Sequence, residues 1–161
     1  SDMLLGSGFD DPYGMPGARL ATADSGERPI PRLAPDTAFF WHAGEEGVLR
    51  VLACGSCERL IHPPAPRCRH CGSTSHAPGD LSGEATLWSW TTVHQPFISW
   101  LEIPYVVGIV AVDEDPEVHL TTRLVDLVEA DLTIGMPLEV RFEHVDHPWL
   151  PLFGPTGAGR G

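Results

Sequence analysis

Residues 52–73, LACGSCERLIHPPAPRCRHCGS, decide the fold, because they hold all four cysteines of the chain as two C-x-x-C pairs. Cys54 and Cys57 form the first pair, and Cys68 and Cys71 form the second. Each C-x-x-C turn directs two sulfurs toward one point, and two such turns complete the tetrahedral thiolate shell that Zn²⁺ prefers. The spacing therefore predicts a structural zinc ribbon. Disulfides, or core cysteines unrelated to a metal, are the alternative interpretations.

A ribbon of this size is too small to bury a core of its own. Metal binding has to supply its folding free energy, which is on the order of 10 kcal/mol or more for structural zinc. Arg50, Arg59, Arg67 and Arg69 lie in or beside the ribbon, where Glu58 is the only acid. We interpret these arginines as offsetting the excess negative charge of four thiolates around a dication. A docking patch for a phosphate or an acidic partner is the alternative.

Composition limits the possible classes of protein. The chain of 161 residues is long enough for one domain or two small ones, and its 17 Gly and 16 Pro favour strands and turns. Its net charge of −12 argues against a general DNA or RNA binder, since nucleic-acid affinity depends on neutralising phosphates. No apolar run approaches the roughly 18 residues of a membrane span, so we expect no membrane association. Cysteines placed to hold a metal favour the reducing cytoplasm.

The segment before the cysteines divides into two parts. Residues 1–34 have no sustained hydrophobic period, and we expect a flexible arm or the linker of a larger protein. A short helix is predicted next, with Asp36 as its N-cap and residues 39–41 as an apolar cluster. Gly44 or Gly47 can end that helix.

The chain after the cysteines has the pattern of β-strands. Together with the strand that leads into the ribbon, strands are expected at 47–52, 84–94, 105–113, 118–125 and 138–144. We also expect a turn at 80–83, a bulge or bend at Gly108 and a helical turn at 129–132. The fold class is therefore mainly β, with a partly open barrel of the OB type. The expected divisions are an arm at 1–34, helix plus ribbon at 35–79, barrel at 80–153 and a flexible tail at 154–161.

Several of these motifs together resemble a known family. The run FFW…LACGSCERLIHPPAPRC..CGS, with YVVGIVAVDED…LTTRLVD…DLTIGMPLEVRFE further on, is similar to the acyl-CoA-associated domain of unknown function family thirty-five. The resemblance implies N-terminal helices, a rubredoxin-like zinc ribbon and a C-terminal OB fold. It implies zinc at the four cysteines, and a required non-catalytic subunit beside thiolase-superfamily enzymes such as the aldolases of sterol side-chain breakdown. Some members are fused to a hotdog-fold hydratase domain, so the arm can be the linker of such a fusion.

The residues offer no self-contained active site. With all cysteines assigned to metal, no Cys–His pair is available. Nothing in the spacing pairs Ser89 or Ser99 with a histidine, and we interpret the carboxylate run at 113–115 as a solvated hairpin turn. The histidines on or near predicted strands are His94, His119, His144 and His147. We therefore predict no catalytic residue.

Two apolar segments in predicted loops are the candidates for partner binding. Loops run over the surface, where contiguous apolar side chains mark interfaces. The alternative is that these side chains fold back to cap an open barrel end. The residues are Phe97, Ile98, Trp100 and Leu101 in the first segment, and Trp149, Leu150, Leu152 and Phe153 in the second.

Three functions are compatible with the sequence. The first is an accessory subunit that binds and stabilises a thiolase-superfamily enzyme acting on acyl-CoA, a retro-aldolase of steroid side-chain degradation. The second is an acyl-CoA or lipid carrier, with Arg123, Arg141 or the ribbon arginines meeting the phosphates of CoA. The third is rubredoxin-like electron transfer with iron at the same four sulfurs.

Overall fold

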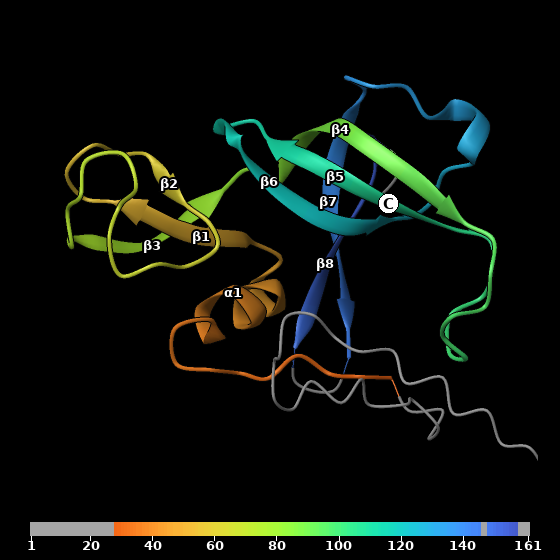
Figure 1. The fold of residues 1–161 in the computed structure, drawn as a ribbon, viewed down its shortest axis with the longest axis horizontal. Coiled ribbons are helices and arrows are strands. Elements are labelled where there is room, and N and C mark those ends of the chain that lie inside the picture. Colours follow the sequence, from red (N-terminus) through yellow and green to blue (C-terminus); the bar gives the residue numbers. More distant parts are fainter. Residues whose placement is uncertain (1–27, 146–147, 158–161) are drawn as a thin grey trace, which may run out of the picture.

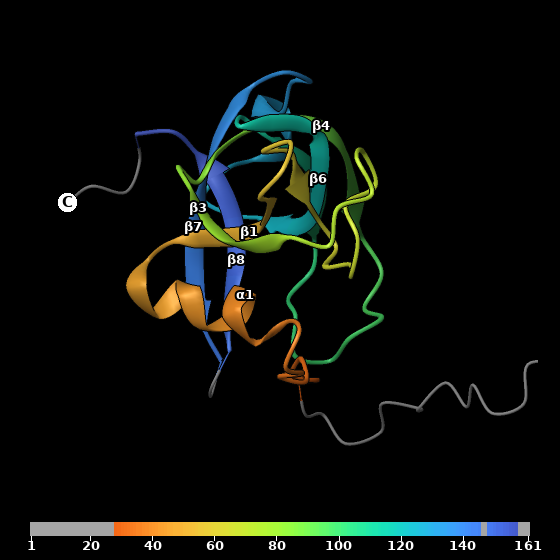
Figure 2. The same ribbon diagram turned by 90° about the vertical axis from the view of Figure 1, so that its left-hand side faces the viewer.

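The computed structural model describes residues 28–145 and 148–157. A three-stranded ribbon sheet lies beside a five-stranded barrel, with a short helix next to both (Figure 1). Seen from the side of the ribbon, the ribbon and the helix lie in front of the barrel (Figure 2). No helix among these residues is long and apolar enough to cross a membrane.

The helical segment is one short helix that tightens into a second. Helix α1 (Ala38–His42) continues as the 3₁₀ helix η1 (Ala43–Glu46), and Gly47 ends it in the left-handed region at φ 72°. The expected stop at Gly47 is therefore confirmed. The expected N-cap at Asp36 is wrong, because Thr37 occupies the N-cap without a side-chain hydrogen bond to the helix. Both helices pack against β1 (Leu49–Cys54) and β8 (Trp149–Pro155).

The ribbon sheet has the strand order β2-β1-β3, with β2 at Leu60–Ile61 and β3 at His76–Leu81. Strand β3 was not expected, since Pro78 and Gly79 are poor strand residues. They are tolerated because β3 is an edge strand, so it needs hydrogen bonds to β1 alone. The turn expected at 80–83 is correspondingly shorter, and Gly83 supplies its positive φ of 83°.

The barrel is closed, in the order β4-β5-β6-β8-β7, where the sequence predicted a partly open one. A parallel pairing of β6 and β8 at Leu124 and Phe153 completes the circle. The helical turn expected near 129–132 is present as η2 (Glu129–Asp131). The remaining barrel strands are β4 (Glu84–Val93), β5 (Tyr105–Val112), β6 (Asp115–Leu124) and β7 (Pro137–His144).

The bulge lies in β4 and not at Gly108. Pairing between β4 and β5 shifts between Leu87 and Ser89, so Trp88 is the extra residue and its side chain is 56% exposed. Gly108 pairs regularly with both neighbouring strands. Glycine is required there for space, because a Cβ atom would lie 2.9 Å from the Leu124 side chain. Gly108 is therefore needed for close packing against Leu124 and not for a bend in the strand.

The closing segment is a barrel strand, where the sequence predicted a surface loop. Residues 149–155 pair with β7 along their whole length, and Phe153 is fully buried in the barrel core. The prolines at 151 and 155 concealed this strand, since proline usually interrupts a β pattern. The tail expected to begin at Gly154 likewise starts inside β8.

The contact between helix and barrel gives a first prediction. Gly44 in η1 is buried, and a Cβ atom there would overlap Trp149 Cβ and lie 2.7 Å from Phe142 Cδ1. Trp149 Cβ is fixed to the β8 backbone, so Gly44→Ala has to push the helix away from the barrel. We expect a loss of about 1–3 kcal/mol in the free energy of unfolding, measured by urea denaturation.

The matched control is Gly79→Ala in β3. A Cβ at Gly79 would lie at 3.4 Å from Ala53 Cβ, so we expect a change within about 0.5 kcal/mol. Equal effects of the two substitutions would contradict this account of the helix contact.

Candidate metal centre and docking surface

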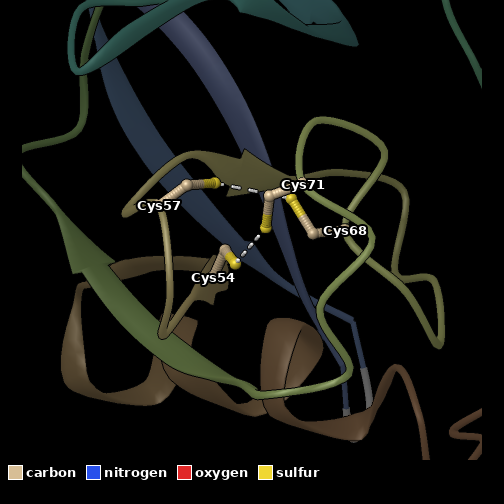
Figure 3. A group of neighbouring side chains, drawn as sticks. All are labelled: Cys54, Cys57, Cys68 and Cys71. Carbon is tan, nitrogen blue, oxygen red and sulfur yellow. Dashed lines mark hydrogen bonds between the residues drawn. The ribbon is translucent and has the colours of Figure 1, made fainter.

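The four cysteine sulfurs gather at one end of the ribbon. Cys54 ends β1, and the other three lie in the turns that follow (Figure 3). All four Sγ atoms lie within 4.8 Å of one another, with 3.5 Å between Cys54 and Cys71 and 3.7 Å between Cys57 and Cys68. Zn–S bonds of about 2.3 Å in a tetrahedron require sulfurs about 3.8 Å apart. The sulfurs are too far apart for disulfides and positioned to bind a structural zinc ion.

Backbone N–H groups in the C-x-x-C turns favour the thiolate form of Cys54. The N–H groups of Cys57 and Ser56 lower the pKa of Cys54 to about 6, and Ser56 N lies 3.4 Å from its sulfur. The Arg59 N–H lowers the pKa of Cys57, but burial and the neighbouring sulfurs outweigh it and raise that pKa to about 12. A bound dication offsets this crowding of negative charge. The residue after each second cysteine, Glu58 or Gly72, takes a positive φ of 61° or 76°.

Two of the four ribbon arginines, Arg50 and Arg59, pair with carboxylates, which corrects our interpretation that these two offset the thiolate charge. Arg67 instead donates to Gly72 O, beside the second cysteine pair, at 3.2 Å. Arg50 binds Asp80 and Glu46. Arg59 reaches out of the ribbon to the barrel, where its Nε donates to Asp115 Oδ2 at 2.9 Å. The two arginines therefore brace the ribbon at its edge and at its contact with the barrel.

Asp115 is buried, and the solvated turn predicted for it is wrong. Its side chain is 8% exposed and accepts hydrogen bonds from Arg59 and from the backbone N–H groups of Leu60 and Glu117. Burial raises its pKa, but these donors prevail and hold the pKa below its ordinary value. One carboxylate thus joins the ribbon strand β2 to the first residue of β6.

The loop between β4 and β5 carries the first set of predicted partner-binding residues. Phe97 is 75% exposed at this loop, while Ile98, Trp100 and Leu101 are half-buried. Ile103 in the same loop is also exposed, and sequence reasoning did not single it out. Trp100 lies under the Arg28 guanidinium, whose carbon is 4.8 Å from the ring centroid. The loop therefore presents two large apolar side chains, of which Phe97 is the more exposed, from a partly packed base.

The second predicted set does not form a loop surface. Phe153 belongs to the barrel core, and Trp149 is half-buried with its ring 4.5 Å from that of His144. Leu150 and Leu152 face a hollow of about 370 Å³ between α1 and the barrel. Phe40 and Trp41 of the helix line its other side. These side chains hold the helix to the barrel, and Leu150 and Leu152 remain accessible from this hollow.

Two of the four histidines considered for catalysis, His119 and His144, lie against tryptophan rings. The ring of His119 stacks on Trp88 at 4.6 Å, and His144 stacks on Trp149. His94 is exposed at the end of β4, and His147 lies outside the described residues. Ser89 is half-buried and Ser99 is exposed.

The buried carboxylate predicts how stability depends on pH. Because the pKa of Asp115 is lowered on folding, its contribution is present above the unfolded value of about 3.9 and is lost as pH falls through the lower folded value. Asp115→Asn should destabilise the chain at pH 7 by about 1–3 kcal/mol. In urea titrations from pH 7 to pH 2.5, the difference from the unsubstituted protein should shrink below about pH 4. The control Glu117→Gln changes a side chain that is 63% exposed and should have little effect.

Metal content gives a further prediction. The purified chain should contain one zinc per chain and be colourless, whereas iron at four thiolates would absorb visible light. Cys68→Ser should lose the metal, and unfolding of the ribbon should follow because metal binding supplies its folding free energy. Elemental analysis and near-ultraviolet circular dichroism measure the two effects. The control Ser56→Ala removes a hydroxyl that bonds to Ser73 beside the cysteines, and it should keep the metal. Stoichiometric zinc in Cys68→Ser would refute the assignment.

Comparison with known proteins follows the same two-part division. Residues 41–77 match the family model described as the ChsH2 rubredoxin-like zinc ribbon domain, and residues 79–143 match the ChsH2 C-terminal OB-fold domain. The second model begins in β3, at the crossing from the ribbon to the barrel.

Curated relatives cover most of this chain. It is 34% identical over 130 residues to the "Probable enoyl-CoA hydratase alpha subunit" of Thermomonospora curvata. It is 32% identical over 139 residues to the 3-oxo-4,17-pregnadiene-20-carboxyl-CoA hydratase alpha subunit of Mycobacterium tuberculosis. These matches cover 80% and 85% of this chain, but the chain spans only 40% and 42% of the two relatives.

Two matches extend over most of the relative as well. A DUF35 domain-containing scaffold protein of Pyrococcus furiosus is 31% identical over 107 residues, which are 62% of this chain and 76% of the relative. A chain in the solved structure of an Ltp2-ChsH2(DUF35) aldolase is 32% identical, with a TM-score of 0.71 over 78% of this chain and 98% of that one. The predicted resemblance is thus confirmed, and the chain belongs to the DUF35 family with its ChsH2-type zinc ribbon and OB-fold domains.

Proposed function

We propose that this chain is a non-catalytic accessory subunit that binds and stabilises a thiolase-superfamily enzyme acting on acyl-CoA. The partner would be a retro-aldolase of steroid side-chain degradation. The observation that carries the proposal is the match over 98% of a chain from the Ltp2-ChsH2(DUF35) aldolase. The relatives named as alpha subunits support a hetero-oligomer. The hydratase activity in their names belongs to much longer proteins and is not carried over.

In this proposal the residues of the chain form a rigid scaffold with a docking loop and take no part in the chemical reaction. The metal-bound ribbon is rigid, and the Arg59–Asp115 pair holds it to the barrel. The loop between β4 and β5 inserts Phe97 into the partner. A single exposed aromatic anchor on a packed base is typical of an interface hot spot. Carbon–carbon bond cleavage takes place on residues of the partner.

The hollow beside α1 favours a second candidate function, the binding of an acyl chain. Its volume of about 370 Å³ and its lining by Phe40, Trp41, Leu150 and Leu152 suit an apolar group. The phosphates of CoA find fewer free cations than the sequence indicated, because Arg123 pairs with Glu143 and Arg141 pairs with Asp126 and Glu139. Titration of the isolated chain with acyl-CoA tests this candidate, and micromolar affinity without a partner would favour it over docking.

Docking is tested by co-expression with a thiolase-superfamily protein encoded beside this chain. We expect one peak containing both proteins on gel filtration. Phe97→Ser should lower the affinity at least about tenfold by calorimetry, because it removes an exposed anchor that the partner would bury.

The matched control is Ile134→Ser, since Ile134 is 58% exposed but precedes Gly135, whose N–H donates to Leu87 O in the middle of β4, away from the loop. It should bind like the unsubstituted chain. Two separate peaks with each thiolase-like neighbour tested would count against an accessory subunit, and an equal loss for both variants would move the interface away from the loop.

A further inference from the structure

Arg28 joins three elements that are distant in the sequence. Its Nη1 donates to Glu143 Oε1 at 2.6 Å and its Nη2 to Glu143 Oε2 at 3.3 Å, so the segment before α1 is tied to β7. The carbon of the same guanidinium lies over the ring of Trp100, in the loop between β4 and β5, at 4.8 Å from the ring centroid. A planar guanidinium can bind a carboxylate with its edge and an aromatic ring with its face at the same time.

The carboxylate is itself held in place from the barrel. Arg123 in β6 donates to Glu143 Oε2 at 2.7 Å, so Glu143 lies between two guanidinium groups. Hydrogen bonding to Arg28 is the main reason that the pKa of Glu143 is lowered, and the group is therefore ionised at neutral pH. The side chains of Arg28, Arg123 and Glu143 are 24%, 28% and 33% exposed, which limits screening by solvent. Arg28 thus meets a fixed partner on β7.

The loop has little else to fix its shape. Within the described chain, the backbone hydrogen bonds of residues 95–104 are local: Phe97 N donates to Gln95 O at 2.9 Å and Leu101 N donates to Ile98 O at 3.5 Å. Trp100 and Leu101 line a hollow together with Leu124 and Leu127, so on this side the loop faces the barrel across open space. A loop with few hydrogen bonds moves unless side-chain contacts hold it.

We propose that Arg28 is a positioning residue that clamps Trp100 to Glu143 and so holds the loop at 95–104 in the shape that presents Phe97. The consequence for docking rests on the proposed function, whereas the consequence for loop order is a property of this chain alone. Arg28, which precedes the ribbon in the sequence, then determines the shape of a loop that follows the ribbon.

Backbone ¹⁵N relaxation of the full zinc-loaded chain measures the clamp directly. Residues 97–101 should have order parameters near about 0.8, falling below about 0.6 in Arg28→Ala and Glu143→Gln. Arg28→Lys should give an intermediate value, because lysine keeps the charge without the planar fork. Arg32→Ala, at an exposed arginine of the same segment, should leave the loop unchanged. Zinc content and barrel order parameters show that each variant is folded.

Partner affinity forms the second arm of the experiment. We expect Arg28→Ala to weaken binding about five- to tenfold, and Phe97→Ser to weaken it while the loop stays ordered. Unchanged order at 97–101 in Arg28→Ala would overturn the clamp even if the partner binds. A disordered loop with full affinity would overturn its role in docking. If the unsubstituted chain binds no partner, the proposed function fails, and the relaxation data still decide the clamp.

Discussion

The rest of the structure depends on four sulfurs that lie within 4.8 Å of one another. The ribbon around them has a small apolar cluster made of Leu52, Ile61 and two of the cysteines themselves. Such a cluster cannot offset the conformational entropy of ordering the turns, so the ion has to supply most of the folding free energy. The ribbon is therefore stable as a loaded unit, and its geometry is set by tetrahedral coordination more than by side-chain packing.

That rigidity reaches the barrel through a short path. Arg59 follows Cys57 by two residues, and its guanidinium binds the buried carboxylate of Asp115 at the start of β6. Apolar contact runs alongside, since Leu49, Val51 and Leu60 of the ribbon belong to the same cluster as the barrel core. Such a half-buried ion pair adds little net stability, but it fixes orientation because the donors and acceptors must align. The ribbon and the barrel are consequently one packed body, although the family models divide them at residues 77 and 79.

The sequence predicted those features that depend on local chemistry and missed those that depend on tertiary pairing. The zinc site followed from cysteine spacing, and the strands β4, β5 and β7 followed from their β-branched and aromatic content. Strands β3 and β8 contain prolines that a local pattern rejects, yet each finds a partner strand that accepts them. Asp115 looked solvated because the arginine that binds it lies 56 residues earlier in the chain. Phe153 looked like an interface residue because its segment was taken for a loop, whereas barrel closure places it in the core.

The molecule separates the part that confers rigidity from the part that presents apolar surface. Figure 1 places the ribbon at one side of the barrel and the loop between β4 and β5 at the opposite side. The ribbon end holds thiolates and their backbone donors, an environment that suits a cation better than an exposed aromatic side chain. At the opposite side, Phe97 is exposed above half-buried neighbours, and the nearby charges of Arg28, Glu143 and Arg123 are paired with one another. Pairing lowers the desolvation cost of covering these three side chains, because each guanidinium already has a charge-assisted hydrogen bond to Glu143. A barrel that is closed and anchored on its far side can therefore offer an apolar contact here without exposing its core.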